Sequence, residues 1–74
     1  MDLTIRMFWD NEAAVWVATS EDVPGLALES GSFDALVERV KIATPEIMEL
    51  NHRKAPIYNL NFVSERRVTV AAYG

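Results

Sequence analysis

The segment from Trp16 to Glu29 constrains the fold most, because it joins two short apolar strands through an acidic turn that contains Pro24 and Gly25. Proline cannot donate to a strand ladder, and glycine adopts positive φ without a steric penalty. The earlier strand must therefore end before Pro24. Ser32, a good N-cap, follows shortly afterwards and predicts a helix that begins at Phe33. Two strands, a tight turn and a helix within so few residues indicate a small mixed fold.

Further strands are expected on both sides of this segment. Alternating apolar residues predict strands over 3–9 and 14–19, which would form a hairpin. β-Branched and aromatic residues predict two more strands over 57–63 and 67–73, joined as a second hairpin. The sequence thus predicts one α+β domain over residues 1–74 with the order β-β-β-α-β-β. Its mainly antiparallel sheet would carry the helix on one face.

The helix is expected to be kinked or broken near its middle. Pro45 cannot donate to the carbonyl of Lys41, and Thr44 before it could act as a fresh N-cap. One kinked helix and two helices that meet near Thr44 both fit the sequence, with the end near Asn51. The apolar stripe has the spacing of one helix face and comprises Phe33, Leu36, Val37, Val40, Ala43, Ile47 and Leu50.

Length and composition restrict the class of protein. A chain of 74 residues buries only about 60% of the surface that its unfolded form exposes, so a second chain would help to stabilise it. The chain has no cysteine and no long apolar segment, so we expect a cytoplasmic protein with no membrane partner. Its net charge of −4 opposes binding to a phosphate backbone and favours a basic partner.

The predicted sheet bears large apolar side chains on both faces, but a single helix can cover only one face. Phe8 and Trp16 would share the open face if their strands pair in register, and Leu60, Phe62 and Tyr73 are candidates to join them. Aromatic side chains are favoured anchors of interfaces, so we interpret these residues as a dimer or partner interface. A homodimer is the simplest closed arrangement. The alternative is that Phe8 or Trp16 is half-buried under loops.

The sequence gives little support for catalysis, and we expect no enzyme activity, no cofactor and no metal. His52 is the only histidine, and a metal site would need further ligands at suitable spacing. Serine residues lack a neighbouring base. Four carboxylates fall in predicted turns, where solvated side chains fit better than paired acid–base chemistry, and they are the candidates for contact with a basic partner: Asp10, Glu12, Glu21 and Asp22.

Three segments resemble HicB-like antitoxin domains. Residues 9–18 are similar to the first hairpin of that superfamily, and residues 22–26 to the Pro-Gly turn after it. Residues 31–36 resemble its helix entry. The best-matching subgroup consists of short, single-domain bacterial proteins that carry a domain of unknown function.

The resemblance implies a partial RNase H-like core, dimerisation and neutralisation of a small basic RNA-cleaving toxin by occlusion. This sequence carries none of the four acidic residues that RNase H catalysis would need. HicB-like regulators continue into a C-terminal DNA-binding segment, and none follows Tyr73, so we expect no direct DNA binding. The alternative function is a stand-alone homodimeric scaffold or adaptor that has no toxin partner.

Overall fold

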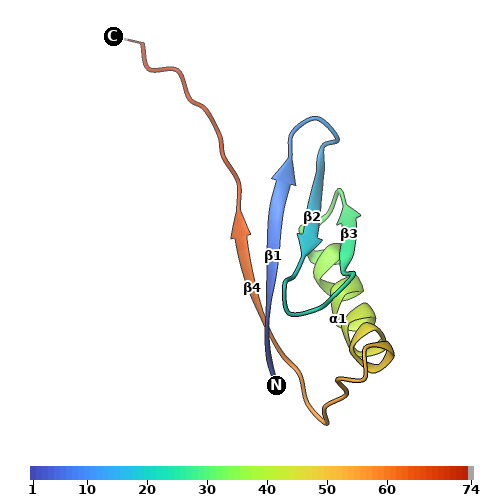
Figure 1. Ribbon diagram of the computed structural model, residues 1–74. Coiled ribbons are helices and arrows are strands. Elements are labelled where there is room, and N and C mark those ends of the chain that lie inside the picture. The colour runs from blue at the N-terminus through green and yellow to red at the C-terminus, as the bar shows by residue number, and fades with distance from the viewer. Residues whose placement is uncertain (74) are drawn as a thin grey trace.

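A computed structural model describes residues 1–73, which form a four-stranded sheet with one helix beside it (Figure 1). The elements are β1 (Asp2–Asp10), β2 (Val15–Thr19), β3 (Ala27–Ser30), α1 (Phe33–Leu50) and β4 (Asn59–Glu65). Their order in the sheet is β3-β2-β1-β4. The β1–β2 and β2–β3 pairs are antiparallel, whereas β4 is parallel to β1. The α+β class is confirmed, with a mixed sheet.

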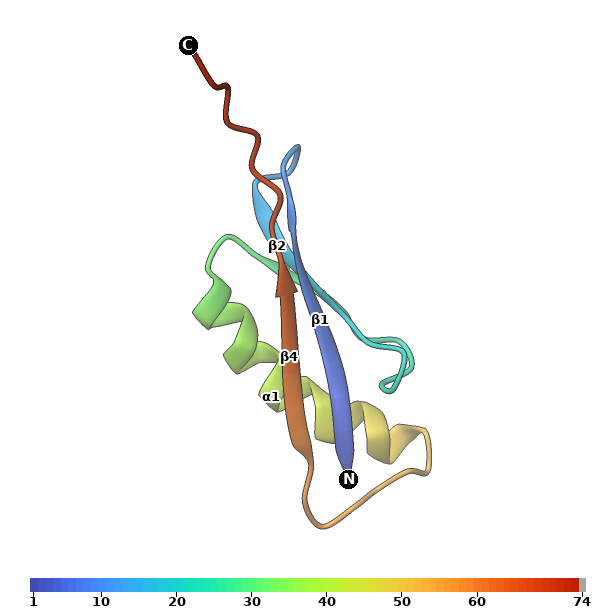
Figure 2. The ribbon, with the colours of Figure 1, turned by 90° about the vertical axis from the view of Figure 1, so that its left-hand side faces the viewer.

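The helix carries the chain from one edge of the sheet to the other. It connects β3 at one edge to β4 at the opposite edge, which is the crossover that a parallel strand requires. In Figure 2, α1 crosses the strands obliquely. Its backbone lies closest to β2 and β3, so β4 is the strand that the helix covers least.

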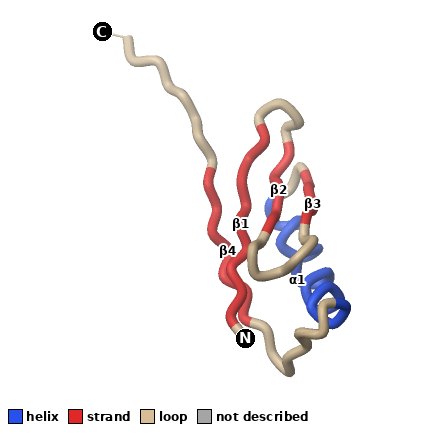
Figure 3. The backbone as a smooth tube through the Cα atoms, in the orientation of Figure 1, coloured by secondary structure: helices blue, strands red, loops and turns tan. Residues whose placement is uncertain are grey.

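The predicted second hairpin is wrong. β4 ends at Glu65, and residues 66–73 continue as an extended segment that leads away from the sheet (Figures 1 and 3). The physical reason is that residues 64–66 contain no glycine, proline, asparagine or aspartate to reverse the chain, whereas the β1–β2 turn has Asp10 and Asn11. The described chain is consequently 57 Å long but only 20 and 18 Å across. We call residues 66–73 the tail.

Pro45 lies inside a single helix, so the alternative of two separate helices is wrong. The Ser32 hydroxyl caps this helix by accepting a hydrogen bond from the Ala35 N–H at 3.2 Å. Leu50 was expected in the apolar stripe but is 80% exposed. The buried line instead repeats every fourth residue and includes a polar side chain: Leu36, Val40, Thr44 and Met48.

The helix ends in a Schellman motif in which a histidine occupies the left-handed position. His52 has a φ of 56°, and its N–H donates to the Glu49 carbonyl at 3.0 Å. The Arg53 N–H donates to the Met48 carbonyl at 2.8 Å. These two bonds satisfy carbonyls that the end of a helix would otherwise leave without donors. The lone histidine therefore holds a backbone position at the helix end.

The turn at Pro24 and Gly25 places two apolar residues in the core. Gly25 has a φ of 86°, as the third residue of a type II turn requires, and the Leu26 N–H donates to the Val23 carbonyl at 3.1 Å. Val23 and Leu26 are both buried. With them, the core between sheet and helix comprises Leu3, Ile5, Met7, Ala18, Leu36, Val40 and Met48.

Candidate interaction surface

The sheet face opposite α1 carries a mixture of apolar and charged side chains, and no helix or strand in residues 1–73 lies over it. Phe8 of β1 is opposite Val17 of β2 and is 38% exposed. Val63 of β4 is 56% exposed on the same side. Because side chains alternate along strands, this face also carries Arg6, Glu29 and Glu65. We call it the outer face.

Phe8 and Trp16 do not share a face, contrary to the sequence-based expectation. The turn between β1 and β2 sets Trp9 opposite Trp16, which directs Trp16 toward the helix side and Phe8 outward. Asp10 fixes this turn, since its Oδ1 accepts hydrogen bonds from the N–H groups of Glu12 and Ala13 at 3.0 and 3.1 Å. A change of one residue in register exchanges the two faces of a strand.

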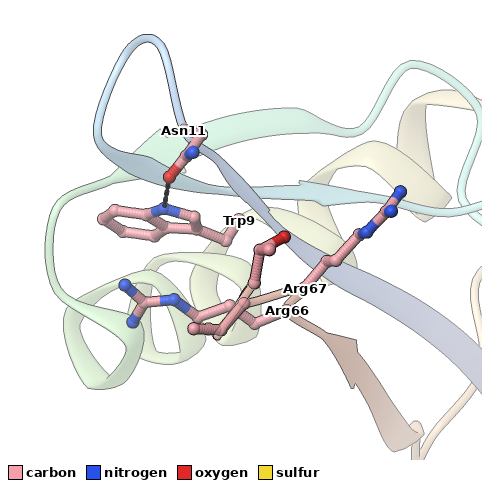
Figure 4. A pocket seen from close by; sticks show the side chains of 6 residues that line it. Trp9, Asn11, Arg66 and Arg67 are labelled. Atoms are coloured by element: carbon pink, nitrogen blue, oxygen red, sulfur yellow. Dashed lines mark hydrogen bonds between the residues drawn. The ribbon is translucent and has the colours of Figure 1, made fainter. Parts of the chain in front are cut away.

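An aromatic cluster occupies one end of the helix side of the sheet. The rings of Trp9 and Trp16 meet edge to face with centroids 5.6 Å apart, and Trp16 meets Phe33 of α1 at 5.0 Å. The Arg66 guanidinium carbon lies 4.3 Å from the centroid of the Trp9 ring, which is cation–π geometry (Figure 4). The cluster joins the start of the tail to the first residue of the helix. Its outermost ring, Trp9, was missed from the sequence because the register was not known.

The Trp9 side chain borders an open hollow of about 530 Å³. Its indole Nε1–H donates to the Asn11 Oδ1 at 3.1 Å, which holds the ring in place (Figure 4). The rest of the hollow is lined by the tail, from Arg66 to Thr69. It contains no nucleophile paired with a base, so its arrangement suits contact with another molecule better than chemistry.

The four predicted acidic contacts fall into two pairs at opposite ends of β2 (Figure 1). In each pair, one carboxylate accepts hydrogen bonds from backbone N–H groups. Asp10 fixes the first turn, and Asp22 accepts a hydrogen bond from the Thr4 N–H at 2.7 Å. Glu12 and Glu21 are exposed and form no hydrogen bond or ion pair through their side chains within the described chain. They are the two carboxylates that remain available to a basic partner.

The other proposed interface residues lie in different places. Leu60 and Phe62 of β4 are half-buried on the helix side, where they line a hollow of about 380 Å³ with Tyr58, Lys41, Thr44 and Pro45. Tyr73 is exposed at the end of the tail. The five residues that the sequence suggested as one interface are thus divided among the outer face, the aromatic cluster, the β4 hollow and the tail.

Residues 1–73 contain neither a cluster of metal ligands nor a membrane-spanning helix. No group of three or more histidine, aspartate or glutamate side chains in this part of the chain could hold a metal ion. None of its helices is both long enough and apolar enough to cross a bilayer.

Comparison with known proteins places the chain in a family. No curated protein matches it. Among solved structures, it is similar to the hypothetical protein TTHA1013 from the extremely thermophilic bacterium Thermus thermophilus. The two are 34% identical with a TM-score of 0.82, over 95% of this chain and 100% of that one. A family model described as a domain of unknown function, DUF1902, matches residues 2–73. The chain therefore belongs to the DUF1902 family.

Proposed function

We propose that this protein is a non-catalytic protein-binding module of the HicB-like antitoxin type, which neutralises a small basic toxin by covering it. The observation that carries the proposal is the outer face, where Phe8 lies opposite Glu65 and Val63 lies opposite Arg6, with both apolar side chains exposed. Aromatic and arginine side chains are enriched in protein interfaces. The net charge of −4 and the free carboxylates of Glu12 and Glu21 favour a basic partner.

The arrangement of the titratable groups supports a role without catalysis. The turn carboxylates are divided between the two ends of β2, and Asp10 and Asp22 are engaged with backbone N–H groups. His52 occupies the left-handed position at the end of α1. Nucleophile, base and orienting group are thus not assembled at one place. The lack of cysteine agrees with a cytoplasmic location, which we propose together with this function.

The local structure of the segments that resemble HicB-like domains also supports the proposal. Residues 9–18 form the end of β1, the turn and most of β2. Residues 22–26 form the Pro-Gly turn, which is exposed at Pro24 and Gly25 and buried at Val23 and Leu26. Residues 31–36 include the capped start of α1. The three resembling segments are therefore consecutive parts of one compact framework.

The test begins with capture of the partner. The tagged full-length chain is incubated with lysate of its own cells at low salt, and the retained proteins are identified by mass spectrometry. A small basic protein bound in fixed ratio is then purified, and inhibition of its RNA-cleaving activity is measured. Phe8→Ala should weaken the complex about tenfold or more, since a central aromatic anchor is lost.

A charge variant tests the acidic contribution separately. Glu12→Lys combined with Glu21→Lys should weaken binding and make its dependence on salt shallower, because both changes reverse exposed charges. Glu46→Lys combined with Glu49→Lys, two exposed changes near the end of α1, is the control of equal net charge and should have a smaller effect. Unchanged affinity for both Phe8→Ala and the double charge variant would refute the proposal.

A second candidate function is a stand-alone homodimeric scaffold or adaptor without a toxin. The outward edge of β4 favours it, because this edge has no neighbouring strand within residues 1–73 and strand edges are templates for another chain. A defined dimer from which no basic protein is recovered, in cells shown to express such a protein, would favour the scaffold over the antitoxin.

A further inference from the structure

The tail has the sequence of a strand but no strand partner within residues 1–73. Polar and apolar residues alternate from Arg67 to Val70, so that Val68, Val70 and Ala72 fall on one side. The other side carries Arg67 and Thr69 and then Ala71 and Tyr73. Val68 is 69% exposed and Val70 is 82% exposed. Such alternation is typical of a strand with one side buried, and in the isolated chain nothing buries it.

The free edge of β4 offers what the tail lacks. β4 pairs with β1 on one side only, so the backbone groups on its other side have no strand partner among the described residues. On the helix side, the hollow of about 380 Å³ beside β4 is lined by Tyr58, Leu60, Phe62 and Pro45. A strand added at this edge would gain backbone hydrogen bonds and would cover an apolar hollow.

The tail of the same chain cannot occupy this edge, because it continues β4 without a turn and leads away from the sheet (Figure 1). We propose that residues 67–73 of a second copy add to the edge of β4 as an antiparallel strand, reciprocally, so that two copies form a two-fold dimer. The inference rests on the proposed self-association and not on toxin binding. The strand exchange joins the two sheets into one continuous sheet, in which each β4 pairs with the tail of the other copy.

Charge and side-chain pattern indicate one register for this exchange. If Glu65 lies opposite Arg67 of the other copy, Phe62 lies opposite Val70 and Asn59 opposite Tyr73. The Glu65–Arg67 pair then forms twice by symmetry. Val68, Val70 and Ala72 fall on the side of Leu60 and Phe62, where the hollow lies.

The first test is the mass of the full chain in solution by light scattering, which should be twice 8.3 kDa. Val70→Asp should give a folded monomer, because it places a carboxylate against the hollow of the partner, where the Lys41 ammonium is already paired with Glu38. It changes a side chain that is exposed in one copy. Thr69→Asp adds the same charge to the other side of the tail and should leave the dimer intact. Circular dichroism and thermal melting check that both variants fold.

The second test traps the register. The natural chain has no cysteine, so Asn61→Cys combined with Ala71→Cys creates the only thiols. These residues would be directly opposite each other on the outer side, within the distance that a disulfide spans, and mild oxidation should give a covalent dimer. Asn61→Cys combined with Thr69→Cys is two residues out of register and should cross-link much less.

Two results would overturn the exchange. One is a wild-type chain that stays monomeric at high micromolar concentration. The other is a dimer whose mass is unaffected by Val70→Asp and which the cysteine pair does not trap. Toxin binding is judged independently through Glu12→Lys combined with Glu21→Lys, since both residues lie outside the tail and the β4 hollow.

Discussion

Trp9 lies directly opposite Trp16 in the β1–β2 pair, and their rings contact edge to face with centroids 5.6 Å apart. Trp16 also contacts Phe33, so it is the middle ring of the cluster. Trp16→Ala should lower the free energy of unfolding by about 3 kcal/mol, because a half-buried indole with neighbours on two sides is removed. Urea denaturation measures the change.

A double-mutant cycle separates the free energy of the Trp9–Trp16 ring contact from the free energy of burying each ring. Trp9→Ala should cost less than Trp16→Ala, since Trp9 is the outer ring. The two changes combined should fall short of additivity by about 1 kcal/mol, the usual coupling of an aromatic pair. Strict additivity would mean that the rings do not stabilise each other.

Thr44 carries a buried hydroxyl that can be removed without changing the shape of the side chain. The residue is fully buried, and its Oγ1 has no hydrogen-bond partner within residues 1–73. A buried polar group without a partner costs about 1–3 kcal/mol, so Thr44→Val should stabilise the fold by about 1 kcal/mol. The midpoint of urea unfolding checks this. Thr44→Ser keeps the hydroxyl, loses a methyl group and should be destabilising. A loss of stability in Thr44→Val would show that the hydroxyl is satisfied in solution.

The features that were predicted correctly from sequence depend on residues close together in the chain. The alternation of Leu3, Ile5 and Met7 identifies the buried side of β1, and the Pro24-Gly25 pair specifies its own turn. Ser32 marks the start of the helix through its side chain. Each of these signals lies in a few consecutive residues, so it can be read before any tertiary contact is known.

The features that were wrong depend on contacts between distant residues. Whether Phe8 or Trp9 faces Trp16 depends on one residue of register, which the alternation alone does not determine. The path of residues 67–73 depends on β4 lying parallel to β1, with Asp2 opposite Asn59. For these reasons, the five residues suggested as one interface lie in different places in the structure, although each of them is apolar as expected.

The left-handed position at the end of α1 is occupied by a residue that is sterically disfavoured there. His52 has a φ of 56°, which costs an L-residue about 1–2 kcal/mol. His52→Gly removes that cost and should raise the melting temperature by about 4–8 °C for each kcal/mol gained. His52→Ala is the matched control, because alanine keeps a Cβ at this positive φ and gains nothing. Equal effects of the two changes would contradict a role for the positive φ.

Glu21 and Asp22 are adjacent carboxylates, but the structure gives them different roles. The Asp22 Oδ2 accepts a hydrogen bond from the Thr4 N–H at 2.7 Å, beside the point where β2 has ended and can no longer pair with β1. Asp22→Ala should therefore lower the free energy of unfolding by about 1–2 kcal/mol. Glu21→Ala should change it by no more than about 0.5 kcal/mol, since exposed side chains without specific contacts contribute little. Thermal and urea unfolding of the two variants provide the comparison. Equal losses would mean that the contact with Thr4 does not stabilise the fold, whereas the expected difference identifies Glu21 as the carboxylate that can be reversed in binding experiments without disturbing the fold.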